Sequence, residues 1–303
     1  MQTAAIWWKT IRGPFFTTSI VPVLLGTSIA FSEGSQINWY HFLLSVGVVL
    51  ACHAGSNLFN DYYDHLTTND DINTVRSPFN GGSGSIQEGI VEPGAVRRGG
   101  LICYALSLTL GLMLFFPHSQ LGQSFVFLGI VSGFCYSKFP GLSYLGLGEL
   151  MVGLSFGPLI VLSTYFAQTA HLSPLPVVVS IPIGLLVAAV LYINQFPDFE
   201  ADKAVNKKNM VVRLGLKRAL PYYYGLLGTA YLVIVAGVLV NLIPTSALIV
   251  FLSLPLAGAA AFRAARWYDK PKELRPANAY TVAAQFSAGL LLTAAFVWTG
   301  LFI

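Results

Sequence analysis

Nine hydrophobic stretches constrain this chain more than any other feature of its sequence. Each is long enough to cross the roughly 30 Å hydrocarbon core of a bilayer as a helix. We expect them at 14–32, 39–60, 99–117, 121–137, 148–168, 174–197, 220–241, 244–262 and 280–302. Of the 303 residues, 55% are hydrophobic and only 10% are charged, which is outside the range of a soluble domain. The sequence predicts an all-α, polytopic membrane protein with nine transmembrane helices in a single domain, residues 1–303.

The positive charges gather on one side of this predicted bundle. All 17 Lys and Arg residues lie at the start of the chain or in alternate loops, whereas the opposite loops, near Gly34, His118, His171 and Asn241, carry Glu33 as their only acid. Loops rich in Lys and Arg stay in the cytoplasm. We therefore expect an integral protein of the cell inner (plasma) membrane, with its N-terminus in the cytoplasm. The net charge of +4 follows from this orientation, and no basic–aromatic pattern indicates a nucleic-acid partner.

Two acid-rich motifs end the second and sixth stretches, on the cytoplasmic side. They are NLFNDYYD and NQFPDFEAD, which supply Asn57, Asn60, Asp61 and Asp64, and Asn194, Asp198 and Asp202. At 3.6 residues per turn, the Asn and Asp residues of each motif, apart from Asn60, share one helix face. Pro197 directly precedes the first Asp of the second motif and is expected to kink or end the helix. A charge within the membrane costs on the order of 3 kcal/mol, so these carboxylates need a positive partner.

The motifs predict a Mg²⁺-dependent reaction of a diphosphate, because Mg²⁺ prefers carboxylate and amide oxygens and leaves positions for substrate phosphates. The expected metal ligands are Asn57, Asp61, Asp64, Asn194, Asp198 and Asp202. The four carboxylates of this set are also the expected catalytic residues. If the diphosphate is attached to an allylic carbon, metal and basic side chains stabilise the leaving group while the carbon–oxygen bond ionises. The carbocation then needs a site without water, which a pocket between helices provides.

A polar loop with basic residues follows each motif. The first, 65–98, contains Arg76 and a flexible Asn-Gly-Gly-Ser-Gly-Ser run, and it is long enough to act as a lid. This run is not a P-loop, because no Gly-Lys-Ser/Thr follows it. The second loop, 198–219, carries six Lys and Arg residues, some of which set the topology or meet anionic lipid. The repeated arrangement predicts two facing metal sites.

Other interpretations of the acids are open. Asp residues at helix ends often cap helices or form salt bridges, but two motifs with matched spacing on one membrane side favour metal binding. Carboxylates in membranes also mark ion pathways, so an ion-coupled transporter is an alternative, although the outward half of the chain is almost bare of charge. A non-catalytic protein that binds prenyl lipids would not need two metal motifs. Cys52, Cys103 and Cys135 are isolated and indicate neither a disulfide framework nor a zinc site.

With these motifs the chain resembles the UbiA superfamily of intramembrane prenyltransferases, which carry an Asn-x-x-x-Asp-type motif after the second helix and Asp-x-x-x-Asp after the sixth. The resemblance covers nearly the whole chain. It implies nine helices around a central cavity, open to the cytoplasm and sideways to lipid, that binds a polyprenyl diphosphate through Mg²⁺ held by both motifs. It also implies residues that contact the substrates, for which the matches here are Arg12, Asn60, Arg76, Tyr136, Lys138 and Lys203.

Within this superfamily the chain is most similar to the menaquinone-pathway enzymes that prenylate 1,4-dihydroxy-2-naphthoate. The similar segments are Gly-Leu-Gly-Glu at 146–149 with the following FGPLIVLSTYFAQT, the Gly-rich segment after Arg76, and DFEADKAVNKKNMVVRLG. This similarity implies that a polyprenyl chain joins the naphthoate ring with loss of its carboxylate, yielding diphosphate and demethylmenaquinone, and that Glu149 contacts the acceptor. Transferases for 4-hydroxybenzoate, homogentisate or a glycerol-phosphate lipid share the motifs and remain alternatives.

Overall fold

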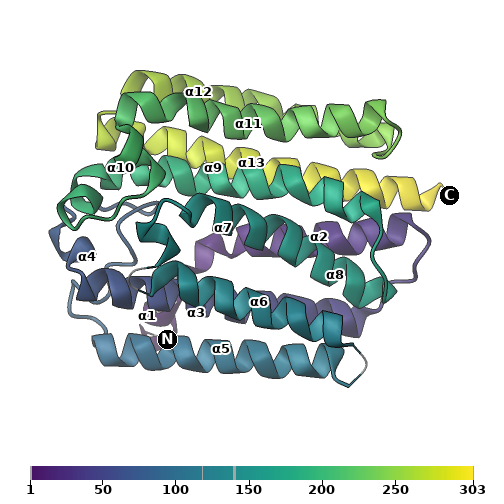
Figure 1. Cartoon of the computed structure of the whole chain (residues 1–303), viewed down its shortest axis with the longest axis horizontal. Helices are drawn as coiled ribbons and strands as arrows, with labels where there is room; N and C mark the ends of the chain where they lie inside the picture. Colours follow the sequence, from purple (N-terminus) through teal and green to yellow (C-terminus); the bar gives the residue numbers. More distant parts are fainter. Residues whose placement is uncertain (1, 118, 139–140, 303) are drawn as a thin grey trace.

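The computed structural model describes residues 2–117, 119–138 and 141–302, which fold into a bundle of long helices (Figure 1). The helices are α1 Gln2–Thr10, η1 Gly13–Phe16, α2 Thr17–Ser32, α3 Trp39–Leu66, α4 Asn69–Ile72, α5 Pro93–Phe115, α6 Gln120–Ser137, η2 Leu142–Tyr144, α7 Gly148–Leu154, η3 Ser155–Leu159, α8 Ile160–Thr169, α9 Pro174–Ala204, α10 Met210–Leu214, α11 Leu216–Leu239, η4 Thr245–Ser253, α12 Leu254–Trp267 and α13 Pro271–Leu301. Among these residues, β-pairing is limited to one isolated bridge, between Ser77 and Asn80. The predicted all-α membrane fold is confirmed.

Eight helices in the described part of the chain are long and apolar enough to cross a membrane. They are Gly13–Ser32, Trp39–Leu66, Pro93–Phe115, Gly148–Thr169, Pro174–Ala204, Leu216–Leu239, Thr245–Trp267 and Pro271–Leu301. The ninth expected span, 121–137, coincides with α6, which is 18 residues long and contains two Gln and three Ser residues that lower its hydropathy. The protein is therefore an integral membrane protein with multiple spans, but the predicted count of nine is not confirmed.

Helices α2 and α9 form the centre of the bundle. In each, 72% of the most apolar stretch is buried inside the protein, compared with 28–44% in the other six spans. The main apolar core lies around them, against α11 and α13 (Figure 1). Helix α9 continues through Pro197 to Ala204, so the prolyl residue does not end the helix. A second, smaller apolar cluster joins α3, α5, α6 and α8 at the end of the bundle that lies away from α4.

Small residues allow α9 to approach the neighbouring α7–η3–α8 rod closely. A Cβ on Gly184 would lie 2.4 Å from the carbonyl oxygen of Gly153, and a Cβ on Gly157 would lie 2.7 Å from Cα of Gly184. Glycines spaced by four along a membrane helix commonly form such contacts. The rod also contains a π-helical turn, η3, around Pro158, as expected where proline cannot donate the usual helical hydrogen bond. This crossing positions α9, and with it the second acid motif.

We expect Gly184→Val to destabilise the bundle, because its side chain would overlap the backbone of Gly153. Overpacking of this kind costs about 1–3 kcal/mol. The melting temperature of the purified protein in detergent should fall. The matched control is Gly258→Val on α12, where nothing lies within 4 Å of an added Cβ. Equal melting temperatures for the two variants would contradict the close crossing.

Candidate active site

The last turns of α3 carry the first acid motif into the protein. Asp61 and Asp64 are buried, although they are carboxylates. The guanidinium of Arg12 donates to the Asp61 carboxylate and to the amide oxygen of Asn60, the latter at 3.0 Å. Arg12 adopts a left-handed backbone conformation with φ of 55°, just before η1, which is uncommon for a residue with a side chain. Burial opposes the charged form of this group, but Asp61 and its neighbouring carboxylates raise the pKa of Arg12 above its usual value.

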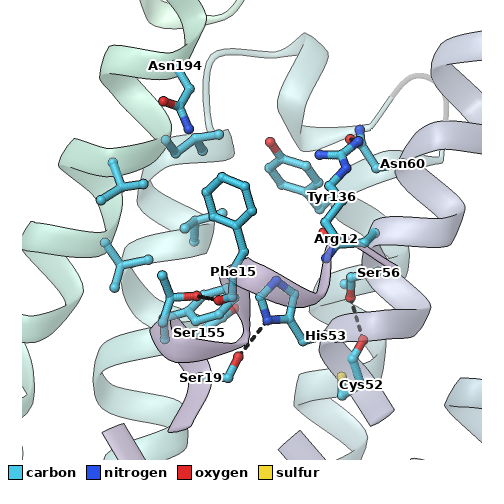
Figure 2. Close-up of a pocket in the computed structure, with 18 of the residues that line it drawn as sticks. Arg12, Phe15, Ser19, Cys52, His53, Ser56, Asn60, Tyr136, Ser155 and Asn194 are labelled. Atoms are coloured by element: carbon cyan, nitrogen blue, oxygen red, sulfur yellow. Dashed lines mark hydrogen bonds between the residues drawn. The ribbon is translucent and has the colours of Figure 1, made fainter. Parts of the chain in front are cut away.

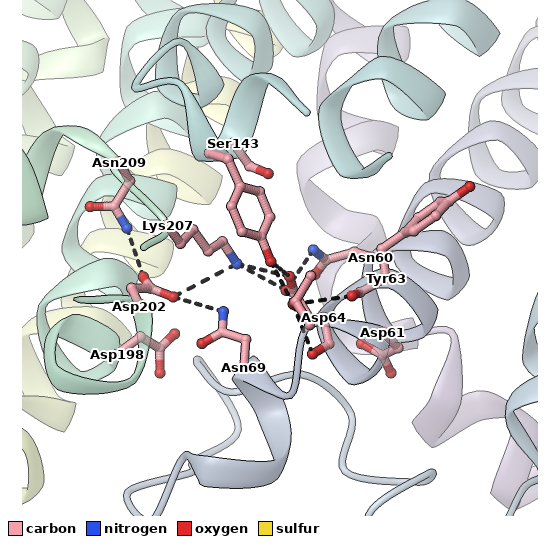
Figure 3. Close-up of polar contacts among 12 residues, drawn as sticks. Asn60, Asp61, Tyr63, Asp64, Asn69, Ser143, Asp198, Asp202, Lys207 and Asn209 are labelled. Atoms are coloured by element: carbon pink, nitrogen blue, oxygen red, sulfur yellow. Dashed lines mark hydrogen bonds and ion pairs between the residues drawn. The ribbon is translucent and has the colours of Figure 1, made fainter. Parts of the chain in front are cut away.

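Lys207 joins the two acid motifs. Its ammonium group lies 2.9 Å from the Asp64 carboxylate on α3 and 3.7 Å from that of Asp202 on α9 (Figure 3), and 5.4 Å from the centre of the Tyr144 ring. Burial disfavours this charge, but the two carboxylates raise the pKa of Lys207 well above its usual value. Asn206 adopts a left-handed conformation with φ of 58°, which reverses the chain after α9. Sequence reasoning counted Lys207 among the loop cations but did not assign it to the site.

The second acid motif is held by amide side chains of the first loop. Asn73 and Asn80 each donate to the Asp198 carboxylate at 2.6 Å, and Asn69 donates to Asp202 at 2.8 Å (Figure 3). Hydrogen bonds of this kind stabilise carboxylates away from water. The loop between α3 and α5 therefore folds over both motifs, as its length predicted.

Arg76 holds this loop together. Its Nε donates to the carbonyl oxygen of Gly81 at 2.6 Å, and its terminal nitrogen donates to the carbonyl oxygen of Asp70 at 2.8 Å. Gly81 and Gly82 have φ of 73° and 69°, a region that side chains disfavour. This conformation lets the backbone N–H of Ser83 donate to Asp61 at 3.2 Å.

The loop also adds a carboxylate that sequence reasoning did not assign to the site. Asp70 on α4 is buried, and its Oδ2 has no hydrogen-bond partner among the described residues. A Cβ on Gly82 would lie 2.1 Å from this oxygen and 3.2 Å from Asp61 Oδ1. Burial and the nearby carboxylates of Asp64 and Asp61 raise the pKa of Asp70 to about 8. The only signal in the sequence was the acidic Asn-Asp-Asp run shortly after the first motif.

Several predicted substrate-binding residues lie away from the cavity. Lys138 is exposed, with its ammonium 5.4 Å from the centre of the Phe134 ring. Lys203 is also exposed, because it follows Asp202 on α9 by one residue and so points about 100° away from it. Glu149 is buried and accepts from the backbone N–H of Met210 at 3.3 Å. None of the three lines the described cavity.

The remaining predicted residues gather at one end of a large cavity, of about 1160 Å³. Those that line it are Arg12, Asn57, Asn60, Asp64, Arg76, Tyr136, Asn194, Asp198 and Asp202. Asp61 does not line it, but it is paired with Arg12, which does. Figure 2 shows Phe15 at the centre of this space, below Asn194 and beside Tyr136. His53 lies deeper and hydrogen-bonds Ser19 at 2.7 Å. The charged side chains that line the cavity lie at one end of it. A transporter would instead have its binding site near the membrane midplane, with access from both sides.

The chemistry of this polar end fits Mg²⁺. It offers carboxylate and amide oxygens, and the buried Asp70 Oδ2 lacks a partner that a cation would supply. Within the ranges the structure describes, no three His, Cys, Asp or Glu side chains form a group that could hold a metal by themselves. In this structure the carboxylates are paired with Lys207 and Arg12. The two facing metal sites therefore stay a prediction.

Comparisons with known proteins agree with this architecture. The chain is 28% identical to a 2-carboxy-1,4-naphthoquinone phytyltransferase of Synechocystis sp., over 99% of this chain and 95% of that protein. It is 30% identical to a 1,4-dihydroxy-2-naphthoate octaprenyltransferase of Bacillus subtilis, over 82% of this chain and 79% of that protein. The solved structure of a UbiA homolog from Archaeoglobus fulgidus bound to DMAPP and Mg²⁺ has the same fold, with a TM-score of 0.63, 15% identity and 98% of both chains covered.

The model of the UbiA prenyltransferase family matches residues 19–300, which is nearly the whole chain. The match includes both acid motifs and the loop that covers them. This chain therefore belongs to the UbiA prenyltransferase family and is a membrane-embedded enzyme that transfers prenyl groups.

Proposed function

We propose that this protein transfers a polyprenyl chain from a polyprenyl diphosphate to 1,4-dihydroxy-2-naphthoate, with decarboxylation, in menaquinone biosynthesis. The proposal is carried by the meeting of five carboxylates and three basic side chains at one end of a single large cavity. These are Asp61, Asp64, Asp70, Asp198 and Asp202, with Arg12, Arg76 and Lys207. The charged end suits a metal-bound diphosphate, and the apolar remainder suits hydrocarbon.

The five carboxylates, with the amides of Asn57 and Asn194, are the residues that would hold Mg²⁺. Three carboxylates come from α3 and α4 and two from α9. Figure 3 shows Asp61 and Asp64 on the side opposite Asp198 and Asp202. When bound there, Mg²⁺ would neutralise charge on the departing diphosphate. The amides of the loop hold Asp198 and Asp202 in place through hydrogen bonds.

The basic side chains are suited to bind the diphosphate oxygens. Arg12 Nε is buried without a hydrogen-bond partner among the described residues, which leaves a donor at the cavity wall. Lys207 carries three donors between the motifs, and Arg76 lines the cavity beside the glycine-rich turn. Contacts between such cations and phosphate are short and strong. Lys138 and Lys203, being exposed and away from the cavity, are replaced in this role by Lys207.

The reaction breaks the bond between prenyl C1 and the diphosphate oxygen, which keeps the electron pair. The ring carbon that bears the carboxylate forms a bond to C1, and the carboxylate leaves as CO₂, which returns its bonding pair to the ring. The direct product is the 1,4-diol of demethylmenaquinone, whose oxidation to the quinone is a separate step. Phe15 and Tyr136 line the cavity where the cation forms. Their ring faces stabilise positive charge, and the packed helices exclude water.

The choice of acceptor rests on the relatives, whose names specify naphthoate or naphthoquinone substrates at 28–30% identity. Transferases for 4-hydroxybenzoate, homogentisate or a glycerol-phosphate lipid are the alternatives. The cytoplasmic orientation in the cell inner membrane rests on the positive charges, which gather at the same end of the chain's spans as the acid motifs.

Product analysis by mass spectrometry tests this function. Purified protein is supplied with a polyprenyl diphosphate and a panel of aromatic acceptors, in the presence of Mg²⁺ or of EDTA. We expect a decarboxylated prenyl-naphthalenediol, or the quinone that air oxidation gives, and its loss with EDTA. Turnover of another acceptor alone would keep the transfer chemistry and overturn the naphthoate assignment.

We expect Asp70→Asn to lower kcat/KM by about 10²-fold and to raise the Mg²⁺ concentration needed for half-maximal rate, because it removes one of the charges that face the metal. The melting temperature should not fall, since the substitution removes a buried carboxylate that the neighbouring carboxylates repel. The matched control is Asp71→Asn, whose side chain lies next to His65 at 3.1 Å and is partly exposed. If both variants had the activity of the wild type, Asp70 would not belong to the metal site.

Lys207→Gln should raise KM for the prenyl diphosphate by at least about tenfold, because one charge-assisted hydrogen bond is lost. KM for the acceptor should change little. Lys208→Gln provides the control, since this neighbour is exposed and its backbone N–H, which donates to Tyr144 at 3.2 Å, is retained. An unchanged KM for the donor in Lys207→Gln would remove Lys207 from the diphosphate site.

A further inference from the structure

A second, smaller pocket lies on the outside of the bundle. It has a volume of about 420 Å³, and among the described residues it shares no lining residue with the large cavity. Its lining residues are Ala259, Phe262, Arg263, Arg266 and Trp267 on α12 and Tyr280 on α13. Phe262 is 68% exposed, and α12 lies at the edge of the bundle (Figure 1). The pocket therefore opens towards the membrane lipid.

This pocket lies at the end of a membrane span. The span Thr245–Trp267 ends at Trp267, which also lines the pocket. Arg263 precedes this end by four residues, which is about 6 Å along a helix. Figure 1 shows this end of α12 at the same end of the bundle as α4, which the proposed orientation places on the cytoplasmic side. Trp and Tyr are enriched at this level, where lipid headgroups meet hydrocarbon.

The two arginines of the pocket carry charge that the protein does not neutralise. Arg263 and Arg266 are three residues apart, so they project from the same face of α12. Their guanidinium carbons lie 5.3 Å from the centre of the Tyr280 ring and 5.1 Å from that of the Trp267 ring. The ammonium of Lys270 lies 5.0 Å from the same Trp267 ring and adds a third positive charge. Among the described residues, neither guanidinium forms a hydrogen bond or an ion pair.

The orientation of the chain in the membrane does not by itself explain this arrangement. The positive-inside rule requires only that Lys and Arg lie in the loops, whereas these two arginines lie within a span and beside aromatic rings. Arg76 and Arg213 instead donate to backbone carbonyl oxygens, at 2.6 Å and 2.7 Å. Asp269 and Glu273, the acids between α12 and the first turn of α13, are exposed. The arginine donors are therefore available to a ligand from outside the protein.

We propose that this pocket binds an anionic phospholipid of the cytoplasmic leaflet, with Arg263 and Arg266 contacting its phosphate and an acyl chain lying along Phe262. Each guanidinium has five N–H donors in a planar arrangement that matches phosphate oxygens. A lipid phosphate is held at the level of the arginines by its own acyl chains, and these chains would cover the exposed apolar side chain. Soluble phosphate offers no such hydrocarbon. The proposal rests on the proposed orientation and uses no residue of the candidate active site.

Native mass spectrometry of the full chain in neutral detergent tests this proposal. Binding of dioleoylphosphatidylglycerol and of dioleoylphosphatidylcholine is measured at matched concentrations, and we expect the wild type to bind the anionic lipid more tightly. Arg263→Gln/Arg266→Gln should weaken phosphatidylglycerol binding by about tenfold or more and leave phosphatidylcholine binding unchanged. The matched control is Arg97→Gln/Arg98→Gln, which removes the same charge from exposed positions on α5 outside both pockets. It should bind both lipids as the wild type does.

Equal losses in the two double variants would overturn the proposal, because the lipid would then respond only to the total charge of the protein. Wild-type affinity in Arg263→Gln/Arg266→Gln would overturn it as well. Displacement of phosphatidylglycerol by an excess of inorganic phosphate would assign the pocket to a soluble anion instead, whereas we expect the lipid to stay bound.

Melting temperatures measured without added lipid show whether the variants are folded. If that of Arg263→Gln/Arg266→Gln falls, Arg266→Gln alone decides, since this side chain is exposed, and wild-type affinity for phosphatidylglycerol in it overturns the proposal. No prenyl donor or acceptor is present in these measurements. Failure of the proposed transferase function would therefore leave the lipid result unchanged.

Discussion

The pairing of buried carboxylates with Arg12 and Lys207 is the interaction on which the cytoplasmic end of this protein depends. Unpaired carboxylates at this depth would be strongly destabilising. Lys207 contacts both α3 and α9, and Arg12 joins the N-terminal segment to α3. These charges therefore also hold the helices around the candidate site in place. A metal-bound diphosphate carries both positive and negative charge. On binding, it would replace contacts between the carboxylates and the basic side chains with its own contacts, so no buried charge would be left unpaired.

The loop after α3 completes this arrangement with groups that carry no charge. Amides of Asn69, Asn73 and Asn80 contact the acids of α9, while the glycine-rich turn brings backbone N–H groups to the acids. Glycine permits this turn because its left-handed conformations would strain other residues. The loop lines the cavity and is a structural link between the two motifs.

The cavity separates two kinds of chemistry along its length. Its cytoplasmic end concentrates charge, and the rest is lined mainly by apolar side chains. A prenyl diphosphate has the same division, with a highly charged head and a hydrocarbon tail. On the proposed function, the charged end would stabilise the leaving group and so favour carbon–oxygen ionisation there. The packed walls keep water from the cation. One cavity can thus bind both parts of the donor and protect the intermediate.

The sequence by itself determined the all-α membrane fold, the one-sided charge and the faces of α3 and α9 that carry the acids, because hydropathy and helical periodicity are local properties. It did not determine which loop residues reach the site. Asp70 and Lys207 lie in it, whereas Lys138, Lys203 and Glu149 do not line the cavity. Only the tertiary structure decided this, since the path of a loop depends on turns such as Asn206 and on contacts with distant helices.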